Sequence, residues 1–277
     1  SVSGDAGIEL AGGSIVTTGS QSLSGPIKLQ AALTTLSTSN AVIGLSGDIT
    51  RLAEVAGNLT INSGTAVVNL SGGLGTSATP LGVLSFSGSG EKKLGGAAYA
   101  ATLSIDGGVT AVNGGIVVTS GSQSYGGELK LGSNTTLTAG GAVSISGKVT
   151  NTSPQSLTIA AGSNAVHFGG SLSEADSRPT SLGAVSVTGS TVTFGTTAAP
   201  ITIVANSLSV TAETMALSGT NVGSVCNSAS ATFAVCLLGP STFNLSSASA
   251  GGEIFGNVIG TASLAMSGAG PLTLTGA

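Results

Sequence analysis

Short apolar–polar–apolar triplets recur along the chain, and they constrain its fold more than any other feature. Pairs such as Gly-Gly, Ser-Gly and Thr-Gly separate them, so each strand is short and ends in a turn. Alternation with a period of two predicts strands with one buried face. We predict that the first and last residues point inward in Ile27–Leu29, Leu59–Ile61, Leu129–Leu131, Leu157–Ile159, Val185–Val187 and Ile201–Ile203. The triplets are Ile27–Leu29, Leu59–Ile61, Leu129–Leu131, Leu157–Ile159, Val185–Val187, Ile201–Ile203, Leu208–Val210 and Leu272–Leu274.

The composition excludes several other classes of protein. Only 7 basic and 11 acidic residues occur among 277, which leaves too little charge for solvent-facing helices or for a nucleic-acid surface. Glycine accounts for 45 residues, and much of the polar remainder is Ser and Thr, which disfavour helix. No apolar run approaches the roughly 20 residues of a membrane helix. An all-β body with Gly-rich turns remains.

A long internal repeat indicates how the strands are arranged. Residues 14–90 and 116–190 share the order of their short motifs, at an offset of about 101 residues. Gly19–Ser22 recurs as Gly121–Ser124, and Ser46–Thr50 recurs as Ser146–Thr150. A parallel stack tolerates small insertions in its turns, and neutral Ser and Thr avoid the repulsion of stacked like charges. We therefore predict a right-handed parallel β-helix, that is, a β-solenoid.

The solenoid is expected to have an irregular part near its C-terminal end. Residues 1–210 should form coils that include both repeats, and residues 251–277 should form the final coils. Between them, residues 211–250 look like an irregular coil or loop that carries Cys226 and Cys236. If the protein is exported, we expect a disulfide between these cysteines; two buried thiols are the alternative.

The motifs also resemble a known family. The segment from Gly121 to Thr138 resembles the β-strand repeats of bacterial exoproteins of the filamentous haemagglutinin type. The segment from Gly268 to Ala277 looks like the opening of an autotransporter-associated β-strand repeat, although the Asn-Thr-Tyr-x-Gly continuation of that repeat is missing. The resemblance implies a β-helix at the cell surface or in the medium, with adhesive or matrix roles and no catalytic residues. It also suggests a piece of a longer protein.

Few residues have the pattern of a chemical site. Glu174 and Asp176 beside Arg178 form the tightest charged cluster, which we interpret as a solvated turn and a candidate partner-contact loop. His167 should point outward between Val166 and Phe168, with no triad around it. The doublet of Lys92 and Lys93 is expected in a solvated loop. We therefore expect no catalytic residue, no metal and no cofactor.

Four functions remain as hypotheses. The first is an extracellular structural or adhesive module of a bacterial surface exoprotein, whose partner is a surface carbohydrate or a receptor. The second is a filament or matrix subunit in which copies stack end to end. The third is a carbohydrate-active β-helix enzyme. The fourth is an ice-binding solenoid. An ice-binding face would need Thr-x-Thr at a fixed coil period, and the motif does not recur in that way in this sequence.

Overall fold

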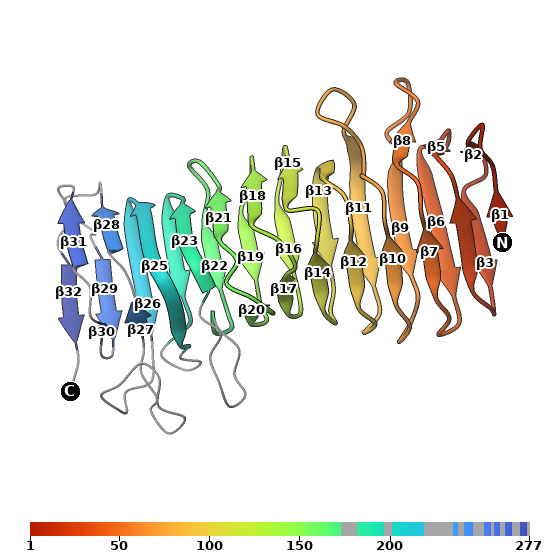
Figure 1. Cartoon of the computed structure of the whole chain (residues 1–277). Helices are drawn as coiled ribbons and strands as arrows, with labels where there is room; N and C mark the ends of the chain where they lie inside the picture. Colours follow the sequence, from red (N-terminus) through yellow and green to blue (C-terminus); the bar gives the residue numbers. More distant parts are fainter. Residues whose placement is uncertain are drawn as a thin grey trace. The chain divides into compact units, whose positions relative to one another are not determined.

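The chain folds into parallel β-sheets that are built from successive coils, as the sequence predicts. The structure is a computed structural model that describes residues 1–172, 182–196 and 201–218, together with the strand segments 235–237, 241–245, 252–255, 258–260, 264–267 and 272–275. These residues are all-β and contain no helix. The chain divides into two units, Ser1–Ser133 and Asn134–Ala277. Each strand pairs with the strand one coil further along (Figure 1).

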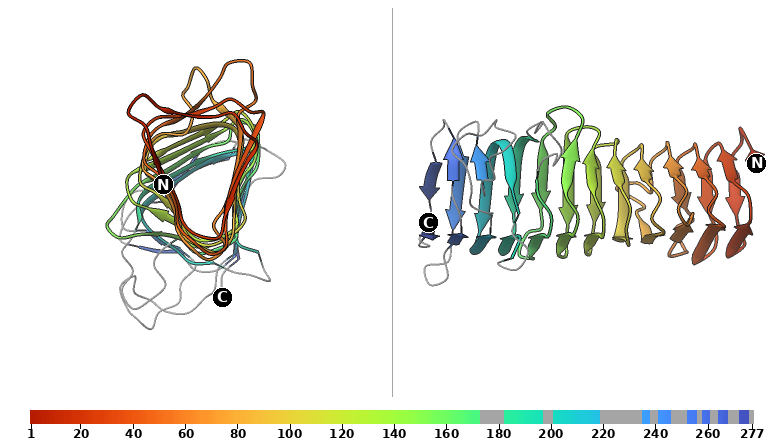
Figure 2. Two further views of the ribbon diagram at one scale, coloured as in Figure 1. Left: turned by 90° about the vertical axis from the view of Figure 1, so that its right-hand side faces the viewer. Right: turned by 90° about the horizontal axis from the view of Figure 1, so that it is seen from below.

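Three parallel sheets surround the core of the first unit (Figure 2). The first sheet contains β1 (Val2–Ser3), β4 (Gln21–Ser24), β7 (Ile43–Leu45), β10 (Val68–Leu70), β12 (Lys92–Leu94), β14 (Thr110–Val112) and β17 (Leu129–Leu131). The second contains β2 (Ile8–Leu10), β5 (Ile27–Leu29) and β8 (Ile49–Arg51), and Leu74 bridges Ile49 to Ala98. The third contains β3 (Ser14–Thr17), β6 (Leu33–Thr38), β9 (Asn58–Asn62), β11 (Leu81–Ser87), β13 (Ala98–Ile105) and β16 (Gln123–Tyr125), while β15 (Ile116–Thr119) pairs with the start of β13.

The second unit has the same construction. One sheet contains β18 (Thr135–Ala139), β21 (Leu157–Ala160), β23 (Leu182–Thr188), β25 (Ile203–Ala212), β28 (Ser241–Leu245) and β31 (Leu264–Ser267). The next contains β19 (Val143–Ile145), β22 (Val166–Phe168), β24 (Thr191–Phe194), β26 (Thr214–Ser218), β29 (Gly252–Phe255) and β32 (Leu272–Thr275). The last contains β20 (Val149–Asn151), the start of β25, β27 (Val235–Leu237) and β30 (Val258–Gly260), with Leu172 bridging Val149 and Ile203.

The side chains that the alternating pattern predicts to point inward fill the interior. All twelve side chains predicted to point inward are buried, and none is more than 3% exposed. They lie in columns because each strand pairs in register with the next, as when Leu59 and Ile61 align with Leu84 and Phe86. Each buried Leu, Ile or Phe contributes roughly 1.5–3 kcal/mol of hydrophobic stabilisation. The apolar columns therefore hold the coils together.

Glycine fills one corner of the first unit because successive coils approach too closely there for a side chain. A Cβ atom on Gly47 would lie 2.0 Å from the carbonyl oxygen of Gly25 in the preceding coil. A Cβ on Gly114 would lie 2.2 Å from the carbonyl group of Gly96. These separations are far below van der Waals contact, so any side chain would force the backbones apart. Stacking at this corner therefore accounts for part of the high glycine content.

A second kind of corner is built by one threonine and one glutamine. In the first repeat, the Gln21 amide Nε2 donates hydrogen bonds to the carbonyl oxygen of Ile15 at 3.0 Å, to that of Ser37 at 2.8 Å and to Thr17 Oγ1 at 3.3 Å. The Thr17 hydroxyl donates in turn to the carbonyl oxygen of Gly19 at 2.6 Å. Gln21 is only 6% exposed, so its side chain replaces water for the polar groups of the turn.

The second repeat uses the same hydrogen bonds at its own corner. Gln123 Nε2 donates to the carbonyl oxygen of Val117 and to Thr119 Oγ1, both at 3.3 Å, and the Thr119 hydroxyl donates to the carbonyl oxygen of Gly121 at 2.7 Å. Here the buried Tyr125 hydroxyl also donates to Gln123 Oε1 at 3.0 Å. Burial raises the pKa of Tyr125 far above its ordinary value, so this phenol stays protonated and remains a donor.

The two repeats do not begin on the same sheet of the solenoid. Gln21 lies in β4 of the first sheet, whereas Gln123 lies in β16 of the third. The motif Ile27–Leu29 forms β5 of the second sheet, whereas its counterpart Leu129–Leu131 forms β17 of the first. The repeat is therefore not a whole number of coils, and the corner motif works at two different corners.

Candidate functional site: hydroxyl columns and a corner groove

One sheet of the first unit carries an unbroken column of hydroxyl groups on its outer side. The column comprises one residue from each strand of the third sheet, and strand register aligns each residue with the next. Neighbouring residues in such a column are about 4.8 Å apart. The middle four are part-exposed, with buried neighbours on both sides in the strand. The members are Ser14, Thr35, Thr60, Ser85, Ser104 and Ser124.

A sheet of the second unit carries the same feature. Register aligns Thr136, Thr158, Ser186 and Ser209 along β18, β21, β23 and β25. A second column, two residues further along each strand, contains Thr188 and Thr211. Thr158, Thr188 and Thr211 are exposed. We call these two sets of residues, one in each unit, the hydroxyl columns.

The hydroxyl columns keep their hydrogen-bonding capacity free. Within the part of the chain that the structure describes, no side-chain hydrogen bond involves the six hydroxyls of the first unit or those of Thr136, Thr158, Ser186 and Ser209. Each hydroxyl is one donor and two acceptors. The columns can therefore exchange hydrogen bonds with a neutral, hydroxyl-bearing ligand that extends along the solenoid.

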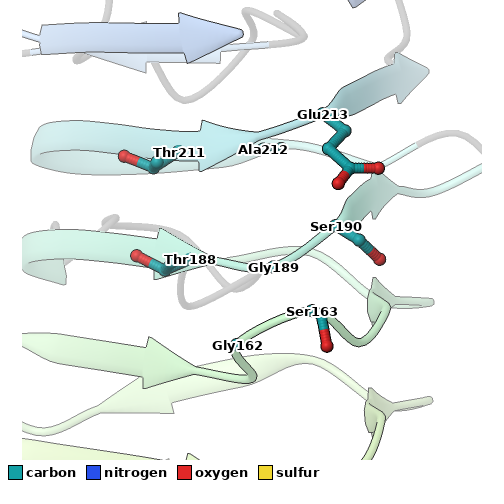
Figure 3. A pocket seen from close by; sticks show the side chains of 8 residues that line it. All are labelled: Gly162, Ser163, Thr188, Gly189, Ser190, Thr211, Ala212 and Glu213. Atoms are coloured by element: carbon teal, nitrogen blue, oxygen red, sulfur yellow. The ribbon is translucent and has the colours of Figure 1, made fainter. Parts of the chain in front are cut away.

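A groove of about 340 Å³ lies at the edge of the column in the second unit. Figure 3 shows Thr188 and Thr211 on one side of it, with Ser163, Ser190 and Glu213 on the other. Small residues lie between the two sides, namely Gly162, Gly189 and Ala212. The groove is thus lined by hydroxyl groups from successive coils and by one carboxylate.

Backbone hydrogen bonds between coils hold the walls of the groove in place. Ser190 N donates to the carbonyl oxygen of Asn164 at 2.9 Å, and Glu213 N donates to that of Ser190 at 2.9 Å. Gly189 N donates to the carbonyl oxygen of Thr211 at 3.1 Å. The Glu213 side chain is exposed and has no ion-pair partner among the described residues. Its carboxylate is therefore free to accept hydrogen bonds or to pair with an external cation.

The expectation for Lys92 is wrong, because this lysine is fully buried. It occupies an inward position of β12, and its Nζ donates hydrogen bonds to the carbonyl oxygens of Gly88 and, at 2.5 Å, Gly107. Burial lowers its pKa, and the charge of Asp106 opposes that shift. Lys93 does lie at the surface, where its Nζ is 3.4 Å from a carboxylate oxygen of Glu91. Carbonyl groups of two successive coils thus compensate one buried ammonium group.

The remaining predicted residues do not form a site in the described structure. His167 is half-buried on the outer side of β22, between the buried Val166 and Phe168, as alternation predicts. Among the described residues there is no group of three side chains able to hold a metal ion. The same part of the chain has no helix long and apolar enough to cross a membrane.

The proposed disulfide and the proposed contact loop cannot be compared with the structure. Glu174, Asp176, Arg178 and Cys226 lie outside the described residues. The backbone of Cys236 belongs to β27, and its side chain is outside the described part.

Sequence reasoning missed the hydroxyl columns because it searched for Thr-x-Thr at a constant spacing. Aligned members of the hydroxyl columns are 19 to 28 residues apart, as for Ser85–Ser104 and Thr158–Ser186, because the turns differ in length. Serine also replaces threonine freely. Aligning the apolar triplets first, and then comparing their middle residues, would have found the columns.

No family model, curated protein or solved structure matches this chain.

Proposed function

We propose that this chain is an adhesive β-solenoid module of a bacterial surface exoprotein, which works outside the cell and binds hydroxyl-rich surface carbohydrate. The observation that carries the proposal is the pair of hydroxyl columns, aligned in register and unused by the protein itself. The resemblance to exoprotein repeats supports the location. The module needs no catalytic group, because its role is to present a stiff surface.

The physical basis is many weak contacts along one polymer. A single hydrogen bond to a ligand adds only about 0.5–1.5 kcal/mol, because it replaces a bond to water. A chain that meets several hydroxyls in succession gains from the high effective concentration of each further contact. Binding should therefore depend on polymer length.

The test removes hydroxyl groups from the column of the second unit. The triple variant Thr158→Val, Ser186→Ala, Ser209→Ala is compared with Ser144→Ala, Thr193→Val on the neighbouring sheet, in pull-down from solution by cellulose and by xylan. The triple variant should bind at least about tenfold more weakly, if each lost bond costs about 0.5 kcal/mol. The control variant should bind like the unmodified chain. Equal losses in both, or no retention of the unmodified chain, would refute the proposal.

A second candidate function, assembly into filaments, rests on the outermost strands. Among the described residues, β1, β2 and β3 pair with β4, β5 and β6, and β30, β31 and β32 pair with β27, β28 and β29. The coils of a second copy could pair with the outer edge of either set of three strands. The two sets also follow the same order, so a second copy could continue the stack.

Sedimentation over a range of concentrations tests this candidate. Ile8 N and Leu10 O bond toward β5, so the backbone of Glu9 faces the opposite edge of β2. Glu9→Pro removes a donor from that edge and leaves the pairing with β5 intact. Filament formation should be reduced in Glu9→Pro and kept in Glu9→Gln. A chain that sediments as a monomer at every concentration would exclude the filament.

A further inference from the structure

The corner groove of the second unit has a counterpart in the first repeat. The repeat aligns Leu182–Thr188 with Leu81–Ser87, so Thr188 and Gly189 correspond to Ser87 and Gly88. One coil further, Ser186 pairs with Ser209 and Ser85 pairs with Ser104, so Glu213 corresponds to Gly108. The two corners can therefore be compared residue by residue.

The two corners differ in charge. In the first repeat, the chain supplies its own ammonium group, because Lys92 Nζ bonds the carbonyl oxygens of Gly88 and Gly107. In the second repeat Val192, which is fully buried, takes the position of Lys92. No Lys or Arg lines the groove there, and the Glu213 carboxylate is without an ion pair among the described residues. In the first repeat the exposed Asp106 takes the position of Thr211. Both corners therefore carry an acid, but only the first also has a buried lysine, which feels the charge of that acid.

We infer that this groove binds a sugar residue that carries an ammonium group, so that the preferred ligand is an amino-sugar polymer. The inference rests on the proposed carbohydrate binding and names its preferred substrate class. Thr188, Thr211, Ser163 and Ser190 offer hydrogen bonds to sugar hydroxyls, and Glu213 pairs with the ammonium. A lysine-rich peptide would satisfy the carboxylate alone and would leave the hydroxyl walls unused, which favours the sugar.

The expected preference is modest because Glu213 is exposed. An exposed ion pair contributes about 0.2–1 kcal/mol, which corresponds to a preference of up to about fivefold for each ammonium. Salt should weaken it, because the Debye length falls to about 8 Å at physiological ionic strength. A polymer that meets the groove through one residue and the column through others would bind through both.

The experiment titrates the whole chain with a β-1,4-linked glucosamine hexamer, with its N-acetylated counterpart and with a lysine hexamer, at mildly acidic pH and low salt. The glucosamine hexamer should bind about two- to fivefold more tightly than the acetylated one. Glu213→Gln should abolish that preference. Glu54→Gln removes the same charge from an exposed turn of the first unit and should preserve it.

The outcomes separate this inference from the proposed function. Equal binding of the two sugar hexamers, equal effects of Glu213→Gln and Glu54→Gln, or equally tight binding of the lysine hexamer would overturn the amino-sugar preference. In that case, if both sugar hexamers still bind and the triple variant Thr158→Val, Ser186→Ala, Ser209→Ala weakens the binding of both, the proposed carbohydrate binding by the column is kept and only the amino-sugar preference is lost. If neither sugar hexamer binds, the amino-sugar inference fails, and the pull-down by cellulose and xylan decides separately whether the proposed function fails as well.

Discussion

The hydrogen bond between Tyr125 and Gln123 gives a sharp test of the corner motif. Tyr125→Phe removes only the hydroxyl group, and the ring keeps its place in a site with no solvent exposure. The lost bond joins the phenol to Gln123 Oε1 at 3.0 Å, and both residues are buried. Because the ring is unchanged, no cavity forms and the cost is that of the bond. The unfolding free energy should therefore fall by about 0.5–1.5 kcal/mol.

Urea unfolding followed by far-ultraviolet circular dichroism measures this loss. Tyr99→Phe is the matched control, because Tyr99 is only part-buried on the outer side of β13 and its hydroxyl makes no hydrogen bond with the described residues. It should change stability by less than about 0.5 kcal/mol. Because the coils of a solenoid can unfold separately, hydrogen exchange of the amides from β15 to β16 locates the effect. Equal midpoints for the two variants, with equal exchange, would refute the role of this bond.

Three further predictions concern buried or crowded positions. Burial lowers the pKa of Lys92 in the folded chain. Between that pKa and about 10.4, the unfolded chain therefore binds more protons than the folded chain. In this pH range the free energy of unfolding should rise with pH, by at most about 1.4 kcal/mol per pH unit. Lys92→Met should lack that rise in urea titrations at alkaline pH. Gly47→Ala should lower the melting temperature, whereas Gly107→Ala, where a Cβ meets nothing within 4 Å, should not. Ile159→Asp places an unpaired charge at a site that is only 1% exposed, so it should lower the free energy of unfolding by roughly 3 kcal/mol or more in denaturant titrations. Thr158→Asp, on the outer face of the same strand, should not cause this loss.

The sequence was sufficient for the fold class and for the inward residues, because both depend on local alternation. Ile27 and Leu29 must share a face whatever the rest of the chain does, since neighbouring side chains of a strand alternate. Turn residues after each triplet then make a stack of short strands more economical than long hairpins. These inferences needed no knowledge of which coil lies next to which.

What the sequence could not supply depends on register between coils. Lys92 is a charged residue, and its burial is compensated by carbonyl oxygens of Gly88 and Gly107, which belong to two successive coils. The hydroxyl columns depend on pairings such as Ser85 with Ser104, which follow from turn lengths that no local pattern encodes. The corner groove likewise forms only when three successive coils are aligned.

The hydroxyl columns are not simply what a stacked sheet requires of its outer face. Stacked like charges repel, so neutral residues would be expected on every sheet if stacking alone decided. The other sheets of the first unit nevertheless carry charge. Glu9 and Lys28 are neighbours on the second sheet, and Lys93 and Lys130 lie on the first, with Ala111 between them.

In the first unit the restriction to hydroxyl groups is therefore specific to one sheet. The repeat does not preserve the position of a segment within the coil, yet Thr60 and Ser85 of the first copy correspond to Thr158 and Ser186 of the second, and both pairs lie in a hydroxyl column. Burial constrains only the inward residues of these segments, so it gives no reason for their outward residues to remain hydroxyls. The ligand that we propose for the outer face would supply that reason, and the columns are accordingly the surface at which partner binding should be tested first.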